Sequence, residues 1–234
     1  MKNRVRRSPP RSRASSSTVP LNRALSKLGL LSRAQATGAI IAGRIRVDGR
    51  VITDPRRAVV PERVRIAIDD APQTRAAWRA LVFHKPRGVV TTRHDPAGRR
   101  TIYDVLGESG TGLVAVGRLD LATSGLLILT TDTQLANRIT DPANAVPRVY
   151  LVTVRGEMTA TMPGVTVRKR SKRETHLVVE LHQGRNREIR KMFATIGHEV
   201  TRLKRVSVGG LELGDLEPGQ WRELTRDEIR RAFP

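Results

Sequence analysis

The sequence predicts an α+β protein built in two parts. The leucines over residues 21–28 recur at the spacing of one helix face, and Asp48-Gly49 between β-branched residues is a strong hairpin signal. From Trp78 onward, short apolar runs separated by turn residues predict strands joined by loops. These observations place a small helix-and-hairpin unit before a larger unit based on a sheet.

Composition points to a polyanionic partner. The 234 residues suffice for one medium domain and one small one. Lys and Arg number 43 against 22 for Asp and Glu, which gives a formal charge of +21. Repulsion among these positive charges lowers the stability of the fold, and a bound polyanion would offset it. Nucleic acid is therefore the leading partner class, and an anionic membrane surface is the second. Most of the cations are arginines, which suit bidentate phosphate contacts, although a codon bias would give the same count.

Several classes of function are excluded by what the sequence lacks. The absence of cysteine excludes disulfides and thiolate metal sites, and no apolar stretch is long enough to span a membrane. No two of the five histidines are spaced at i+4, and neither a phosphate-binding glycine motif nor a nucleophile elbow occurs. We therefore expect a cytoplasmic protein that uses no metal and has no membrane partner.

The smaller unit is expected to follow a basic, Ser/Pro-rich tail, residues 1–20, whose composition predicts disorder. Ser32 begins a capping box that is typical of a helix N-terminus. Two helices, a hairpin and a strand are predicted in that order, over residues 21–28, 32–41, 44–52 and 64–68. The polar stretch 70–79 is expected to be a linker.

The larger unit, residues 80–234, is predicted to consist mainly of strands. They are expected over residues 81–83, 89–92, 113–116, 126–129, 148–154, 177–181 and 200–208. Asp132 is a suitable cap for a helix over 135–139, which Pro142 would stop. An apolar stripe predicts a second helix over 186–196, ended by Gly197.

The stretch from Gly117 to Asp132 contains the candidate for chemistry. Asp120 lies on a loop between two apolar runs, with Arg118 two residues before it. Its neighbours are basic or neutral, so paired-carboxylate hydrolysis is excluded, and a positive setting keeps a carboxylate ionised, as a nucleophile requires. The alternative is an ordinary loop aspartate that accepts backbone hydrogen bonds.

The helix predicted from residue 186 carries like charges on one face. Arg187, Arg190 and Lys191 are spaced at i, i+3 and i+4, so they repel one another. Such a cluster is tolerated where an anion, either a carboxylate or phosphates, lies opposite.

The smaller unit resembles the alpha-L RNA-binding domain. The resemblance covers residues 21–69 and rests on the Gly-Leu-Leu-Ser-Arg turn and the Ala-Gly-Arg-Ile-Arg-Val-Asp-Gly run within the expected order of elements. It implies RNA contacts by the basic residues Arg23, Lys27, Arg33, Arg44 and Arg46.

The larger unit resembles the pseudouridine synthases of the RsuA/RluB-like branch. Five motifs follow in the family's order: residues 84–88, 117–132, 148–152, 184–192 and 209–225. The resemblance implies a mixed, mainly antiparallel sheet with flanking helices. Departures from the usual pattern are His84 for Asn, Gln183 for Glu and Arg148 for Lys.

This second resemblance implies a reaction and its residues. Asp120 would be the nucleophile that begins the isomerisation of a flipped-out uridine in ribosomal RNA, without a cofactor. Tyr150 would stack on the flipped base and help remove the final proton, Arg190 would pair with the acid, and Arg118 would fill the vacated space. Lys85 and Arg187, in companion motifs, complete the expected RNA contacts.

The expected partner is ribosomal RNA or a ribosomal-subunit assembly intermediate, and we expect the protein to act as a monomer. The alternative is a non-catalytic RNA-binding or ribosome-assembly protein on the same scaffold, which the charge and the smaller unit would suit equally well. The acid, the tyrosine and the arginine favour the enzyme, because a protein that only binds RNA has no need of them.

Overall fold

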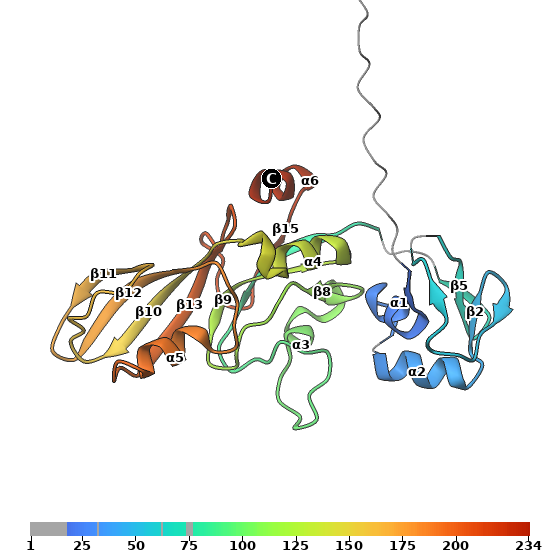
Figure 1. Ribbon diagram of the computed structural model, residues 1–234, viewed down its shortest axis with the longest axis horizontal. Coiled ribbons are helices and arrows are strands. Elements are labelled where there is room, and N and C mark those ends of the chain that lie inside the picture. The colour runs from blue at the N-terminus through green and yellow to red at the C-terminus, as the bar shows by residue number, and fades with distance from the viewer. Residues whose placement is uncertain (1–17, 32, 62, 74–76) are drawn as a thin grey trace, which may run out of the picture. The chain divides into compact units, whose positions relative to one another are not determined.

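The computed structural model divides the chain into an N-terminal unit, residues 1–75, and a sheet unit, residues 76–234 (Figure 1). It describes residues 18–31, 33–61, 63–73 and 77–234. Most of the predicted basic tail, the predicted cap residue Ser32 and part of the predicted linker lie outside the described residues.

The N-terminal unit packs two helices on a small sheet. Its helices are α1 (Leu21–Lys27) and α2 (Arg33–Ile41). Four strands form a sheet in the order β3-β2-β5-β6, with bounds Arg50–Val51, Ile45–Val47, Ile66–Ile68 and Ala71–Gln73. Leu25 and Ile40 from the helices pack with Ile45 in one buried cluster. The predicted helices and hairpin are thus present.

Two short strands appear where the sequence predicts tail and linker. β1 (Val19–Pro20) pairs with β4 (Ala58–Val59), so residues 19 and 20, predicted as part of the tail, belong to a strand. β6, in the predicted linker, pairs with β5 across a turn at Asp69 and Asp70, whose φ angles are 51° and 61°. Two successive positive φ angles are the geometry of a type I′ hairpin turn, which aspartate tolerates better than most residues.

The sheet unit contains one nine-stranded sheet. Its main path runs β11-β12-β10-β13-β9-β7-β15, while β14 pairs with β13 and β8 with β9. All pairings are antiparallel except that between β13 and β9, which confirms the α+β prediction. In chain order from β7 to β15, the bounds are Ala80–Lys85, Val114–Ala115, Ser124–Thr130, Arg148–Arg155, Val165–Arg170, Glu174–Leu181, Val200–Val208, Leu211–Glu212 and Trp221–Glu223.

Helices cover both faces of this sheet (Figure 1). α3 (Ile102–Leu106) and α5 (Glu188–Ala194) contribute to one buried cluster, and α4 (Thr133–Thr140) and α6 (Arg226–Ala232) contribute to the other. Short 3₁₀ turns, η1 (Gly107–Gly110) and η2 (Pro142–Asn144), follow α3 and α4. Because β9 lies between two covered faces, Leu127 and Leu129 enter the first cluster and Leu126 and Ile128 the second.

The helix caps confirm one prediction and mark two helices that were not predicted. The Asp132 side chain accepts hydrogen bonds from the backbone N–H groups of Gln134 and Leu135, as predicted. Capping boxes begin at Thr101 and Thr225 and start α3 and α6, two helices that were not predicted from the sequence. The predicted strand over 89–92 is wrong, since only one bridge, between Val90 and Thr101, forms there.

The parallel contact between β9 and β13 depends on Gly125. This residue has a φ of 112°, and a Cβ atom added to it would lie 2.1 Å from the backbone oxygen of Arg205. Any side chain would therefore push β13 away from β9. The two strands meet here so closely that the fold admits only glycine.

We predict that Gly125→Ala lowers the free energy of unfolding of the protein by about 3–5 kcal/mol, because strand separation adds to the cost of the positive φ. Gly156→Ala is the matched control, since Gly156 has a φ of 79° with no atom within 4 Å of an added Cβ. It should cost about 1 kcal/mol. Urea unfolding of both variants measures the difference, and equal shifts would contradict the steric argument.

Candidate active site

The loop between β8 and β9 is fixed through its backbone carbonyls. The carbonyl of Leu119 accepts from the Thr91 hydroxyl at 2.9 Å, and that of Leu121 accepts from the backbone N–H of Gly88 at 2.8 Å. The carbonyl of Ala122 accepts from Nη2 of Arg190 at 3.3 Å. The loop that carries Asp120 is thus held by the chain after β7 and by α5, two segments far apart in the sequence.

Lys85 holds the same loop from within the protein. Its ammonium donates to the backbone oxygens of Pro86, Asp120 and Thr123 at 2.9, 3.2 and 2.8 Å. The predicted RNA contact by Lys85 is wrong, because the residue is fully buried and its three donors are used inside the protein. Burial lowers its pKa to about 8, and the Asp120 carboxylate opposes that shift.

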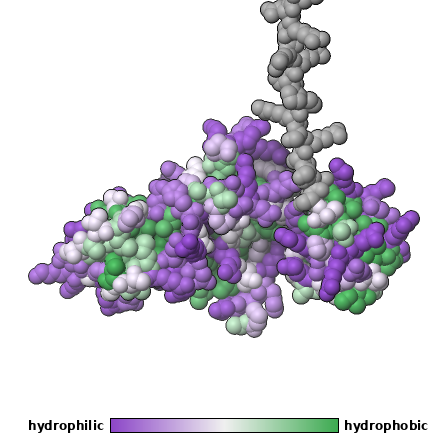
Figure 2. Space-filling model, viewed as in Figure 1, coloured by the Kyte–Doolittle hydropathy of each residue, from purple (hydrophilic) through white to green (hydrophobic). Residues whose placement is uncertain are grey.

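A cavity of about 670 Å³ opens above this loop. Asp120 lines the cavity and is partly exposed. The loop turns at this residue, because the backbone N–H of Thr123 donates a hydrogen bond to the backbone oxygen of Asp120. The structure brings to this one cavity the predicted residues Arg118, Tyr150, Arg187 and Arg190. The visible surface over this part of the sheet unit, around α4 and α5, is mainly hydrophilic (Figure 2).

Arg190 contacts the loop backbone in place of the carboxylate. Its Nη1 donates to the backbone oxygen of Val200 at 2.8 Å and its Nη2 to that of Ala122, while Nε is buried with no hydrogen-bond partner in the described part of the chain. Among the described residues no ion pair joins Asp120 to a cation within 4.0 Å. Burial and then Arg187 lower the pKa of Arg190, whereas the Asp120 charge raises it. The two residues therefore interact through space.

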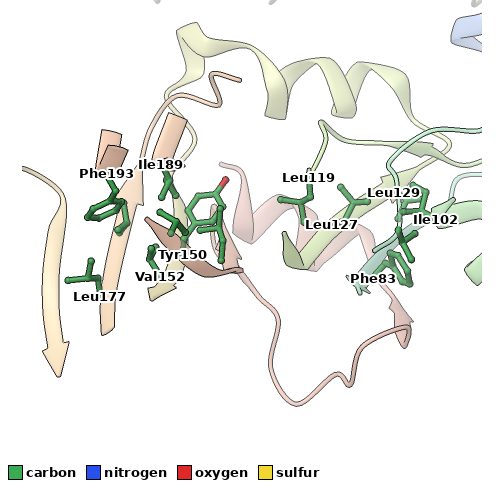
Figure 3. Close-up of a cluster of buried hydrophobic side chains, with 14 of the residues drawn as sticks. Phe83, Ile102, Leu119, Leu127, Leu129, Tyr150, Val152, Leu177, Ile189 and Phe193 are labelled. Carbon is green, nitrogen blue, oxygen red and sulfur yellow. The ribbon is translucent and has the colours of Figure 1, made fainter. Parts of the chain in front are cut away.

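Tyr150 lies on β10 with its ring largely in the core. It is 8% exposed and belongs to the cluster that contains Val152, Ile189 and Phe193. In Figure 3 the ring lies near Ile189, and its hydroxyl oxygen points away from Phe193 and Leu177. The core thus fixes the ring at the cavity wall, with one part left to the cavity.

The exposed cations of the site belong to two loops. Arg118 precedes the acid, and Arg185 and Arg187 lie in the segment before α5. Arg187 itself has a φ of 52°, so the chain turns sharply into α5 there. Glu188, the other carboxylate of the lining, accepts from the backbone N–H of Arg185 at 3.0 Å and serves its own loop.

Two buried arginines of the cavity wall were not among the predicted site residues. Arg148 and Arg205 are 8% and 5% exposed, and both line the cavity. Nη1 of Arg148 donates to the backbone oxygen of Val146 at 2.8 Å, and Nη2 donates to that of Ile139 at 2.9 Å. Arg148 thus connects the backbone at these two residues. Strand alternation could have placed Arg205 on the same face as the apolar Leu203, two residues before it.

The N-terminal unit has its own basic residues. Arg23 and Arg33 are exposed on α1 and α2, and Lys27 is partly buried. Arg44 and Arg46 form ion pairs with Asp69 and Asp70. These two arginines therefore have anionic partners within their own sheet, and the RNA contacts expected of all five stay predictions.

The described part of the chain offers neither a metal site nor a membrane span. No group of three or more His, Cys, Asp or Glu side chains there could hold a metal ion. No helix of these residues is long and apolar enough to cross a membrane.

Comparison with known proteins assigns both units. Residues 79–195 match the RNA pseudouridylate synthase family and residues 19–64 match the S4 domain. An uncharacterized RNA pseudouridine synthase of Aquifex aeolicus is 34% identical over 92% of this chain and 94% of its own. Ribosomal large subunit pseudouridine synthase B of Vibrio cholerae is 37% identical over 89% of this chain and 72% of its own, and that of Bacillus subtilis is 31% identical over 90% and 94%.

A solved structure agrees with these matches. A crystal structure of a pseudouridylate synthase superimposes with a TM-score of 0.61 and 27% identity, covering 92% of this chain and 99% of the other. The predicted order of an RNA-binding unit and a synthase domain is therefore confirmed. The chain is an RNA pseudouridine synthase of the RsuA/RluB-like family, with an S4 domain at its N-terminus.

Proposed function

We propose that the protein isomerises a specific uridine of ribosomal RNA to pseudouridine, with Asp120 as the nucleophile. The observation that carries the proposal is the position of Asp120, a partly exposed carboxylate on a loop whose backbone is fixed, facing a cavity lined by Tyr150 and Arg190. The names of the Vibrio and Bacillus relatives favour the large-subunit RNA as the first substrate to test.

The reaction exchanges one bond to the ribose for another. A carboxylate oxygen of Asp120 attacks C1′ of the ribose, and the bond from C1′ to N1 breaks with its electron pair left on the uracil. The uracil turns, C5 bonds to C1′, and the carboxylate is released. The proton on C5 then passes to solvent, and N1 takes up a proton. Atoms and charge balance without a cofactor.

The other residues of the cavity have separate tasks in this proposal. The uridine must leave its stack before Asp120 can reach C1′, and Arg118, exposed at the cavity, fills the space that it leaves. Tyr150 supplies a rigid aromatic surface for the flipped base, since its ring is held by the core. The exposed Arg185 and Arg187 bind the phosphates on either side.

We predict that Asp120→Asn lowers the rate of pseudouridine formation at least about 1,000-fold, because an amide cannot act as the nucleophile. RNA affinity should stay the same or rise, since the substitution removes a negative charge from a surface that binds phosphates. Chemical mapping of pseudouridine in ribosomal RNA measures the first effect, and filter binding measures the second. Asp215→Asn is the control, because Asp215 is exposed outside the cavity. Equal activity of the two variants would rule out Asp120 as the nucleophile.

We predict that the single-turnover rate at saturating RNA falls as the pH rises through about 8. Lys85 loses its proton there, and a neutral amine has two N–H donors for three carbonyls, so the loop that carries Asp120 loosens. Rates measured between pH 6.5 and 9.5 test this expectation, and a flat profile to pH 9.5 would contradict it.

Unfolding gives the opposite pH dependence for the same group. The ordinary pKa of the lysine is 10.5, and burial lowers it to about 8, so the unfolded chain binds the proton more strongly between these values. Stability contributed by Lys85 therefore rises over that range of pH. Urea unfolding in the same buffers separates a loss of rate caused by the loop from one caused by unfolding.

A further inference from the structure

Arg205 is buried in the wall of the cavity, and no carboxylate of the described residues forms an ion pair with it. It lies on β13, is 5% exposed, and donates from Nε to the backbone oxygen of Leu126 at 2.8 Å. Its terminal nitrogens have no hydrogen-bond acceptor among the described residues. In that part of the chain, the fully buried side-chain nitrogen and oxygen atoms without a hydrogen-bond partner are Thr123 Oγ1 and Arg190 Nε. The terminal nitrogens of Arg205 are not among them, so these nitrogens are not completely buried. The free end of Arg205 therefore remains open to the cavity that it lines.

The surroundings of Arg205 add positive charge. Burial, and after it the charge of the nearby Arg205, lowers the pKa of Arg148. Burying a cation is costly unless its donors are used, and a second cation nearby increases that cost. The terminal nitrogens of Arg148 donate hydrogen bonds to backbone carbonyls, whereas those of Arg205 donate to no acceptor among the described residues. An acceptor supplied by the bound RNA would use them.

The strand register indicates which part of the RNA that acceptor belongs to. Arg205 is the cross-strand neighbour of Tyr150, and side chains of such neighbours project on the same face, about 5 Å apart. A base stacked on Tyr150 would therefore present its edge to Arg205. The phosphates are better served by Arg118, Arg185 and Arg187, which are exposed, than by a buried arginine.

We propose that Arg205 is a catalytic residue that donates hydrogen bonds to a carbonyl oxygen of the target uracil and stabilises the charge that develops there. This inference rests on the proposed function. When the bond between N1 and C1′ breaks, the electron pair left on the ring is shared with its carbonyl oxygens. A neutral acceptor thereby becomes a charged one, and hydrogen bonds from a guanidinium strengthen at that moment. The planar fork of N–H donors can also follow an oxygen as the ring turns.

The test combines Arg205 variants with altered uracil rings. Single-turnover rates are measured at saturating RNA on a fragment that contains the uridine identified by mapping. Arg205→Met should lower the rate about 10- to 100-fold, as expected for one charge-assisted hydrogen bond made in the transition state, while RNA affinity changes less than about threefold. Arg205→Lys keeps the charge without the fork and should give an intermediate rate. Arg202→Met is the control, because Arg202 is exposed on the same strand and three residues away, on the opposite face.

Replacing either uracil carbonyl oxygen by sulfur identifies the contact. Sulfur accepts hydrogen bonds weakly, so 2-thiouridine or 4-thiouridine at the target should slow the wild-type protein. The substitution at the contacted oxygen should slow Arg205→Met much less, since the bond is already missing. If Arg205→Met does not fold, the same comparison is made with Arg205→Lys.

Two outcomes would overturn the assignment of Arg205. One is a rate for Arg205→Met that matches Arg202→Met, and the other is equal slowing of wild type and variant by both sulfur substitutions. A wild-type protein that forms no pseudouridine would contradict the proposed function itself. The failure of one proposal is therefore distinct from the failure of the other.

Discussion

A buried ammonium holds the loop that carries Asp120 in place. Lys85 ends β7 and donates to the carbonyls of Pro86, Asp120 and Thr123. Removing an ammonium group from water costs on the order of several kcal/mol, and these three hydrogen bonds offset that penalty. Thr91, Gly88 and Arg190 donate to three further carbonyls of the loop, those of Leu119, Leu121 and Ala122. The Asp120 carboxylate needs no ion pair to be positioned, because its backbone is fixed. It remains available to a substrate.

The sheet supplies the second constraint. β9 and β7 contribute side chains to both buried clusters, so both faces of these two strands are covered. At Gly125 the chain comes close enough to β13 to place Arg205 beside the start of β9. On its other side β13 pairs with β10, which places Arg205 opposite Tyr150. A single parallel contact in a largely antiparallel sheet thus joins the loop of the acid to the strand that carries the buried arginine.

Charge is distributed differently in the two units. In the N-terminal unit, Arg44 and Arg46 are neutralised by aspartates in their own sheet, which leaves the exposed helix residues as the better candidates for phosphate contacts. In the cavity, the cations bind carbonyls or face open space. An enzyme whose substrate is a polyanion can keep such charges unpaired, because the phosphates of the substrate offset their repulsion when it binds.

The sequence by itself determined the family and the types of most of the elements it predicted, because apolar periodicity, caps and linear motifs are local properties. It did not reveal β6, β11, α3 or α6, it predicted a strand over 89–92 that does not form, and it assigned Lys85 to the RNA surface. Only the tertiary structure decided that Lys85 faces inward and that Arg205 meets Tyr150. The physical reason is that strand pairing over more than fifty residues sets which side chains share a cavity, and no local pattern encodes that register.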